Sequence, residues 1–208
     1  MEIIVSWNIN LDKVESFDMF TNYRTVGAFL LCVSAMQLQV SQSSNKGASM
    51  SGNAEVKTVD SVELNKYVGL WYEIAKIPNS FQKKCSRNTT ATYVLRDDGR
   101  IDVINRCVES DGTVDEARGI ARVVDTVTNS KLEVSFVRVL GLQLFWGDYW
   151  IIGLDCEYKY AVVGTPSRKY GWILSRTPTL SHEDLDKIFE TLRFQGYDPK
   201  SFVFTEQR

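Results

Sequence analysis

Residues 89–108 read TTATYVLRDDGRIDVINRCV, and this stretch decides the class of fold. Apolar and polar residues alternate through 89–95 and again through 100–108, and the turn between the two runs ends in Asp98 and Gly99. A period of two is typical of strands that bury one face, and an Asp-Gly pair between two such runs indicates a hairpin. The stretch therefore predicts two adjacent antiparallel strands.

The same pattern extends in both directions from this hairpin. Short runs of aromatic and β-branched residues recur at even spacing, and most connections between them contain Gly, Asp or Asn. This arrangement predicts an all-β fold, an eight-stranded up-and-down antiparallel β-barrel, rather than strands that alternate with helices. The expected strands are 67–77, 89–95, 100–108, 115–124, 131–139, 148–154, 159–164 and 171–175.

One C-terminal helix is expected after the last barrel strand. Ser181 can cap its start, Gly196 can end it, and four apolar residues between them recur at the spacing of one helix face. This face is expected to pack against the barrel, and a short last strand is expected over 201–205. The four apolar residues are Leu185, Ile188, Phe189 and Leu192.

The N-terminal part has the composition of an export signal followed by a linker. Residues 26–35, VGAFLLCVSA, form an apolar run of about ten residues, which is too short to span a bilayer and typical of a signal peptide cleaved after Ala35. The residues that follow are rich in Ser, Gln and Asn and lack apolar periodicity. We expect an extension with signal peptide over 1–35, a flexible linker over 36–58 and the barrel domain over 59–208.

Export predicts a secreted or periplasmic protein. Cys32 lies within the apolar run and raises the alternative of an outer-membrane lipoprotein, but Leu31 stands where lipid attachment needs a small residue. The lipoprotein is therefore the less favoured location. Met19 is an alternative start that would leave a compact region ahead of the apolar run.

The composition excludes several classes of function. The chain has 24 basic and 26 acidic residues, so no strong positive field would recruit nucleic acid. A single histidine, His182, excludes zinc sites built from several imidazoles and leaves one candidate base for a nucleophile. His182 is expected to be exposed in the first turn of the helix. We therefore expect no catalytic residue, no metal and no cofactor.

Three cysteines follow the apolar run. Cys85 and Cys107 flank the predicted hairpin and can meet across it, and cysteines of exported proteins tend to pair. Cys156 is then left over. A buried small hydrophobe, an intermolecular bridge and a different pairing remain open for it.

Alternation also predicts which side chains point into the barrel. Tyr93, the pair Val134 and Phe136, and the pair Trp172 and Leu174 each fall on an apolar face of their strand. The interior of an eight-stranded barrel is either filled by side chains or holds one small ligand. An apolar lining suits an acyl chain or a flat apolar molecule, and a packed core fits the same pattern. The pattern alone leaves both open.

Three segments resemble sequence blocks of the lipocalins. They are GLWYEIA at 69–75, LDCEYKYAVV at 154–163 and WILSRTP at 172–178, in that order. The hairpin over 90–105 is similar to the branch that holds apolipoprotein D and the bacterial outer-membrane lipocalins. The resemblance covers about residues 60–207, and it implies a barrel that carries small hydrophobic ligands.

The resemblance also implies structural roles at one end of the barrel. In this family the Trp that matches Trp71 lies at the closed end, and the Arg that matches Arg176 lies across its indole ring. Gly69 and Asp155 belong to the first and second blocks and are likewise expected to be structural.

In the apolipoprotein D branch, the positions that match Tyr93, Phe136 and Trp172 line the ligand cavity, in agreement with the alternation. Asn105 is expected to be a polar group within it. The expected ligand-binding residues are Tyr93, Asn105, Val134, Phe136, Trp172 and Leu174.

The predicted function is transport of a small hydrophobic ligand, such as a fatty acid or lysophospholipid. Lys83, Lys84 and Arg87 in the first loop would either attract an anionic head group or simply be solvated. A lipocalin-fold enzyme of the isomerase type, using Cys156 or an acid in the barrel, is one alternative, although no nucleophile–base pair can be assigned. A protein-interaction module with a filled barrel is another. A homodimer and peripheral membrane association also stay open.

Overall fold

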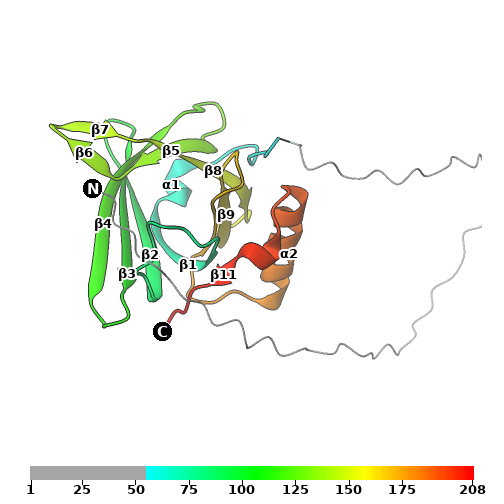
Figure 1. Ribbon diagram of the computed structural model, residues 1–208. Coiled ribbons are helices and arrows are strands. Elements are labelled where there is room, and N and C mark those ends of the chain that lie inside the picture. The colour runs from blue at the N-terminus through cyan, green and yellow to red at the C-terminus, as the bar shows by residue number, and fades with distance from the viewer. Residues whose placement is uncertain (1–54) are drawn as a thin grey trace, which may run out of the picture. The chain divides into compact units, whose positions relative to one another are not determined.

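Eight antiparallel strands close into a barrel in the computed structural model, which describes residues 55–208 (Figure 1). The strands pair in chain order, and the pairing of the last with the first closes the sheet. The predicted all-β barrel is confirmed, whereas the signal peptide, Cys32 and the linker up to residue 54 lie outside the described residues. The barrel strands are β1 (Gly69–Lys76), β2 (Arg87–Leu95), β3 (Ile101–Val108), β4 (Val114–Val123), β5 (Lys131–Ser135), β8 (Gly147–Leu154), β9 (Tyr160–Gly164) and β10 (Gly171–Ser175).

Strand directions alternate around the barrel, so its connections gather at two ends. The closed end carries the one-turn helix α1 (Leu64–Tyr67) and the turns β2–β3, β4–β5 and β8–β9. The opposite end, here called the open end, carries the connections of β1–β2, β3–β4, β5–β8 and β9–β10. These open-end connections are 77–86, 109–113, 136–146 and 165–170.

β2 and β3 form the antiparallel hairpin that the sequence pattern predicts. Ala91 lies opposite Asn105, and Tyr93 lies opposite Val103. Burial alternates along β2, where Thr89, Ala91 and Tyr93 are buried and the residues between them are only partly buried. One face of the hairpin therefore points into the barrel, as expected for a half-buried pair of strands.

Helix α2 (His182–Phe194) packs on the outside of the barrel. Ser181 caps it by accepting a hydrogen bond from the Asp184 N–H, and His182 is exposed, both as expected. Ile188 and Leu192 are fully buried in an apolar cluster with residues of the outer barrel face. The helix is thus held by apolar packing along one stripe.

The chain ahead of α1 is fastened to the same side of the barrel. Val56 is buried in the cluster under α2, and the Lys57 N–H donates to the Gln195 side chain. The Val59 N–H donates to the Ile151 carbonyl oxygen on β8. The packed chain therefore begins slightly before residue 59.

The fifth predicted strand, 131–139, is wrong beyond its first half. β5 ends at Ser135, whose hydroxyl donates to the Leu144 carbonyl oxygen, and the chain then leaves the barrel as a separate hairpin. This hairpin consists of β6 (Val137–Val139) and β7 (Leu142–Leu144), which form their own two-stranded sheet. The alternation shifts by one residue at the adjacent apolar residues Phe136 and Val137, so the sequence carries a local sign of the break that a single strand over 131–139 overlooks.

The C-terminal strand pairs with the part of β1 near the open end that β2 does not reach. β1 pairs with β2 only as far as Tyr72, and β11 (Val203–Phe204) pairs with Ala75 and Lys76 beyond that point. A 3₁₀ turn, η1 (Pro199–Ser201), leads into β11. The expected short last strand is therefore present, and it covers the part of β1 that β2 leaves unpaired.

Cys85 and Cys107 form a disulfide, as predicted, with their Cα atoms 5.4 Å apart. The bond ties the β1–β2 connection to β3. Cys156 has a free, exposed thiol in the β8–β9 turn. A buried role for Cys156 and its pairing with either of the other two cysteines are therefore wrong.

Candidate functional site

The closed end of the barrel is held by Arg176, which follows β10. Its guanidinium lies 3.7 Å from the centroid of the Trp71 ring, and burial lowers its pKa. Its Nη1 donates to the Leu70 carbonyl oxygen at 2.7 Å, and its Nη2 donates to the carbonyl oxygens of Lys66, Tyr67 and Val68. These contacts join α1, β1 and β10, so the structure places Trp71 and Arg176 together where this end closes.

Gly69 and Asp155 shape the backbone at the same end. Gly69 has φ +98°, a conformation that glycine adopts readily, and a Cβ there would lie 3.4 Å from Arg176 Nη1. The Asp155 carboxylate accepts hydrogen bonds from the backbone N–H groups of Glu157 and Lys159. Asp155 therefore organises the β8–β9 turn rather than facing the interior.

Three tyrosines form a hydroxyl chain inside the barrel. The Tyr149 hydroxyl lies 2.7 Å from that of Tyr67 and 2.9 Å from that of Tyr93. Burial raises the pKa of Tyr93 to about 12 and the pKa values of Tyr67 and Tyr149 well above the ordinary value. All three phenols are therefore neutral near pH 7, and they form a polar layer inside the apolar core.

Sequence reasoning missed two members of this chain, Tyr67 and Tyr149. Tyr67 was expected in the first strand, but it belongs to α1, which turns its ring toward Trp71 at a centroid distance of 5.2 Å. Tyr149 shares a face of β8 with the fully buried Ile151, so alternation along that strand could have identified it.

A buried carboxylate, Glu73, organises the open end. Its Oε1 accepts from Lys76 Nζ and from the Thr205 hydroxyl, both at 2.6 Å, and its Oε2 accepts from Gln82 Nε2 at 2.7 Å. Gln82 Oε1 in turn accepts from the indole N–H of Trp172 at 3.0 Å. Glu73 is thus fully partnered, and through Gln82 it fixes the orientation of the Trp172 ring.

Aromatic rings gather around Trp172 at the same end. The Tyr170 ring stacks on it at a centroid distance of 6.2 Å, and Phe81 lies 5.5 Å from Tyr170 and 6.2 Å from Trp172. Phe81 is 58% exposed. The rim beside β10 is therefore apolar and partly open to solvent.

The other predicted ligand residues occupy different depths. Leu174 is buried in the interior cluster with Tyr93, and Val134 is partly buried against that cluster. Phe136 is 40% exposed just beyond the end of β5. Its ring covers Gly119 of β4, where a Cβ would come within 2.7 Å of the ring. The structure therefore brings Tyr93, Val134 and Leu174 into the core and leaves Phe136 near the mouth.

Two polar atoms on the inner face of the β2–β3 hairpin lack partners. Asn105 Oδ1 and Thr89 Oγ1 are buried, and neither makes a hydrogen bond to the described residues. Thr89 is only 4% exposed and shares its face of β2 with Ala91 and Tyr93. The sequence reading overlooked Thr89, although the same alternation that identified Tyr93 points to it.

The candidate nucleophile Cys156 and the candidate base His182 lie outside the barrel interior, and the candidate cation Lys84 is paired within the protein. Cys156 is exposed in a turn at the closed end, and His182 is exposed on α2. Lys84 forms ion pairs with Asp115 at 2.6 Å and Glu109 at 3.5 Å, so its charge is compensated within the protein. Among residues 55–208, no three potential metal ligands gather, and no helix is long and apolar enough to cross a membrane.

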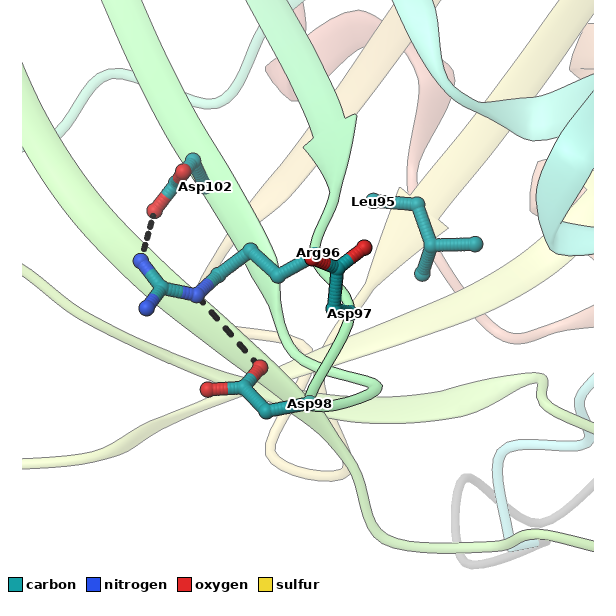
Figure 2. A pocket seen from close by; sticks show the side chains of 5 residues that line it. All are labelled: Leu95, Arg96, Asp97, Asp98 and Asp102. Atoms are coloured by element: carbon teal, nitrogen blue, oxygen red, sulfur yellow. Dashed lines mark hydrogen bonds and ion pairs between the residues drawn. The ribbon is translucent and has the colours of Figure 1, made fainter.

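A surface depression of about 470 Å³ lies outside the barrel at the β2–β3 turn (Figure 2). Arg96 bridges Asp98 and Asp102 there, and hydrogen bonds from Arg100 hold the pKa of Asp98 at about 2. Arg96, Asp98 and Asp102 of its lining are paired with one another, and it lies outside the barrel. Its lining residues are Leu95, Arg96, Asp97, Asp98 and Asp102.

Comparison with known proteins gives close relatives by sequence. A family profile described as a lipocalin-like domain matches residues 62–207. The outer membrane lipoprotein Blc of Vibrio cholerae is 41% identical over 155 residues, which cover 74% of this chain and 87% of that protein. Apolipoprotein D of Macaca fascicularis is 36% identical over 154 residues, which cover 69% and 76%.

Solved structures show the same fold at lower identity. Insecticyanin from the tobacco hornworm Manduca sexta superposes with a TM-score of 0.60 at 22% identity and covers 74% of this chain and 85% of that chain. Lobster apocrustacyanin A1 gives 0.55 at 18%, with 69% and 79% covered. Together with the family profile and the sequence relatives, the barrel shows that the chain belongs to the lipocalin family, which binds small hydrophobic ligands.

Proposed function

We propose that this protein is an exported carrier that takes up one lipid of the fatty-acid or lysophospholipid class through the open end of its barrel. The observation that carries the proposal is a pair of buried atoms, Thr89 Oγ1 and Asn105 Oδ1, which lack a partner in the described part of the chain and lie on an otherwise largely apolar face. A buried polar atom without a hydrogen bond is costly, so its presence calls for a partner. A ligand hydroxyl or carboxyl group can donate to Asn105 and accept from Thr89.

The aromatic rim supports an apolar tail on the same ligand. Phe136 is exposed and Trp172 is partly buried at the open end, where an acyl chain would replace water. Each buried methylene contributes ~0.8 kcal/mol, so a tail of roughly sixteen carbons offers on the order of 10 kcal/mol before association costs. A dissociation constant in the micromolar range follows, which suits a carrier that must release its ligand.

We further propose that the protein transports its ligand outside the cytoplasm and does not act as an enzyme. The Cys85–Cys107 disulfide favours an oxidising compartment, and the sequence relatives include an outer membrane lipoprotein. The exposed positions of Cys156 and His182 favour a carrier over an enzyme, because neither side chain is available to a ligand inside the barrel.

The test is a fluorescence titration of the full chain with cis-parinaric acid, a fatty acid that fluoresces when it enters an apolar site. Wild type should bind saturably, and the double variant Phe136→Ala and Trp172→Ala should bind roughly tenfold more weakly or worse because two apolar walls are removed. Phe194→Ala, on the exposed face of α2, is the matched control and should bind as wild type does. Absence of saturable binding, or equal affinity of the double variant when folded, would refute the proposal.

Thr89→Val separates the ligand role of the orphan hydroxyl from a structural role. The change keeps the shape and removes an unsatisfied polar atom, so the free protein should become as stable or more stable. Fatty-acid affinity should nevertheless fall, because the ligand loses a hydrogen-bond partner. Unchanged affinity would show that the ligand does not use Thr89.

A further inference from the structure

The hairpin of β6 and β7 extends away from the barrel at its open end. Figure 1 shows it projecting beyond the barrel wall, and its two strands pair with each other rather than with the barrel sheet. Each strand has three residues. At ~3.3 Å per residue the hairpin reaches about 10 Å outward.

One face of this hairpin is entirely apolar. Val137 lies opposite Leu144, and Val139 lies opposite Leu142, while the other face carries the pair Arg138 and Gln143. All four apolar side chains are exposed. A contiguous exposed apolar surface of this kind marks an interaction site.

Leu140 at the tip and Phe145 at the base of the hairpin expose large apolar side chains on a costly backbone. Leu140 is 98% exposed with φ +49°, and Phe145 is 81% exposed with φ +57°. Asn, Asp or Gly is the usual residue in this left-handed conformation, and each would also be more soluble. Leu140 and Phe145 therefore lower the solubility of the protein and strain its backbone. These two costs indicate that their side chains have a function.

The base of the hairpin is aromatic and basic. The Arg122 guanidinium lies 4.1 Å from the centroid of the Trp146 ring, and Arg138 adds a second cation on the polar face. No acidic residue occurs from 134 to 147. An apolar tip below a belt of Trp and Arg is the composition of a segment that enters the interfacial region of a membrane, where the cations meet lipid phosphates.

We propose that the β6–β7 hairpin inserts its tip into the interfacial region of a phospholipid bilayer and docks the open end of the barrel on the membrane. Its reach of about 10 Å matches the 5–10 Å depth of interfacial segments. Deeper insertion would cost free energy, because β6 and β7 pair only with each other. The backbone groups on their outer edges need water or head groups as hydrogen-bond partners.

A second copy of the chain fits this surface less well than a bilayer. Stable protein interfaces use about 20–30 residues on each side, whereas this apolar surface consists of one turn and two three-residue strands. Docking requires no ligand in the barrel, so the inference goes beyond the proposed carrier function and can fail or hold separately from it.

The experiment reports the surroundings of the tip itself. Leu140→Cys is labelled with an environment-sensitive nitrobenzoxadiazole dye in the full chain, with Cys32 and Cys156 replaced by Ser. The matched control carries the label at Val127→Cys, an 89% exposed apolar position in the β4–β5 turn at the closed end. Vesicles of phosphatidylcholine, with and without phosphatidylglycerol, are then added.

The label at residue 140 should shift to shorter emission wavelength with vesicles, and the label at 127 should not. No shift with either vesicle, or a shift at both positions, overturns the proposal. A shift without vesicles that grows with protein concentration overturns it in favour of self-association.

Vesicle sedimentation provides an independent measurement. Leu140→Asp with Phe145→Asp should lower vesicle partitioning roughly tenfold or more, since two exposed apolar anchors become charged. Val127→Asp should leave it unchanged. Equal partitioning of the two variants would contradict the hairpin as the docking element. Parinaric-acid affinity should stay within twofold in both variants, which keeps this result distinct from a failure of the carrier function.

Discussion

At the scale of single residues, Arg176 connects elements that are remote along the chain, because it follows β10 and contacts α1 and β1. Its guanidinium donates to four carbonyl oxygens and covers the Trp71 ring. Lysine has one ammonium group and cannot reproduce this planar set of donors. The closed end therefore depends on the shape of the guanidinium as much as on its charge.

Arg176→Lys should lower the free energy of unfolding by about 2–3 kcal/mol, because the carbonyl oxygens of Lys66, Tyr67, Val68 and Leu70 lose a shared charged donor and Trp71 loses its stacked cation. Urea denaturation measures the loss. Arg118→Lys is the control, since Arg118 is exposed and only pairs with Glu116, and it should change stability by less than about 0.5 kcal/mol. Equal effects of the two changes would contradict the bridging role of Arg176.

Tyr149→Phe should destabilise the barrel by about 1–3 kcal/mol, because the hydroxyls of Tyr67 and Tyr93 lose their shared partner in an apolar interior. Tyr160→Phe removes a hydroxyl that makes no hydrogen bond to the described residues and should cost less. The two transitions can be compared by thermal denaturation. A loss no larger than that of Tyr160→Phe would rule out a stabilising hydroxyl chain.

At the scale of elements, the junction of β4 and β5 decides where the chain leaves the barrel. A Cβ on Gly119 would lie 2.7 Å from the Phe136 ring and 2.7 Å from the Ser135 carbonyl oxygen. The bare backbone of β4 therefore lets Phe136 fold over the strand at the point where β5 ends and the hairpin begins.

Gly119→Ala should cost about 1–3 kcal/mol, as other overpacked sites do, and should displace Phe136 from its place near the mouth. Gly147→Ala is the control, because the nearest atom to its new Cβ would be 3.8 Å away, an ordinary contact. Denaturation curves give the stability difference, and parinaric-acid binding reports the displaced ring. If both alanines behaved alike, the close approach at Gly119 would not matter.

At the scale of the whole molecule, the buried phenols couple stability to alkaline pH. The unfolded chain releases tyrosine protons near pH 10, whereas Tyr93 in the folded barrel has a pKa of about 12. Below pH 10 the phenol is protonated in both states, so stability is at its full value. Above pH 10 the unfolded state loses protons first and is favoured, so stability falls toward pH 12.

The free energy of unfolding should therefore fall by about 2 kcal/mol through Tyr93 alone as pH rises from about 10 to 12. Tyr93→Phe should flatten this dependence, because it removes the buried phenol. Urea denaturation at a series of alkaline pH values checks the slope. An equally steep decline in Tyr93→Phe would exclude the buried phenol as its source.

Local sequence patterns predicted the barrel and its outer helix correctly. The period-two alternation of 89–108 and its Asp-Gly turn predicted the hairpin of β2 and β3, and the position of the disulfide at Cys85 and Cys107 followed from that hairpin. The prediction failed beyond Ser135, because the shift of the alternation at Phe136 and Val137 was not read as a break and because the contact of Phe136 with Gly119 joins residues from two strands.

The sequence by itself determined the eight-stranded barrel, its outer helix and the inward faces of β2, β5 and β10, because periodicity, turns and caps are properties of neighbouring residues. Only the tertiary structure decided how that interior is used. Tyr67, Tyr93 and Tyr149 meet through their hydroxyls, and Thr89 and Asn105 keep polar atoms without partners among residues 55–208, because closure of the sheet sets distances between strands that are remote along the chain. Projection of the β6–β7 hairpin from the rim is likewise decided by contacts across strands, which no local period encodes.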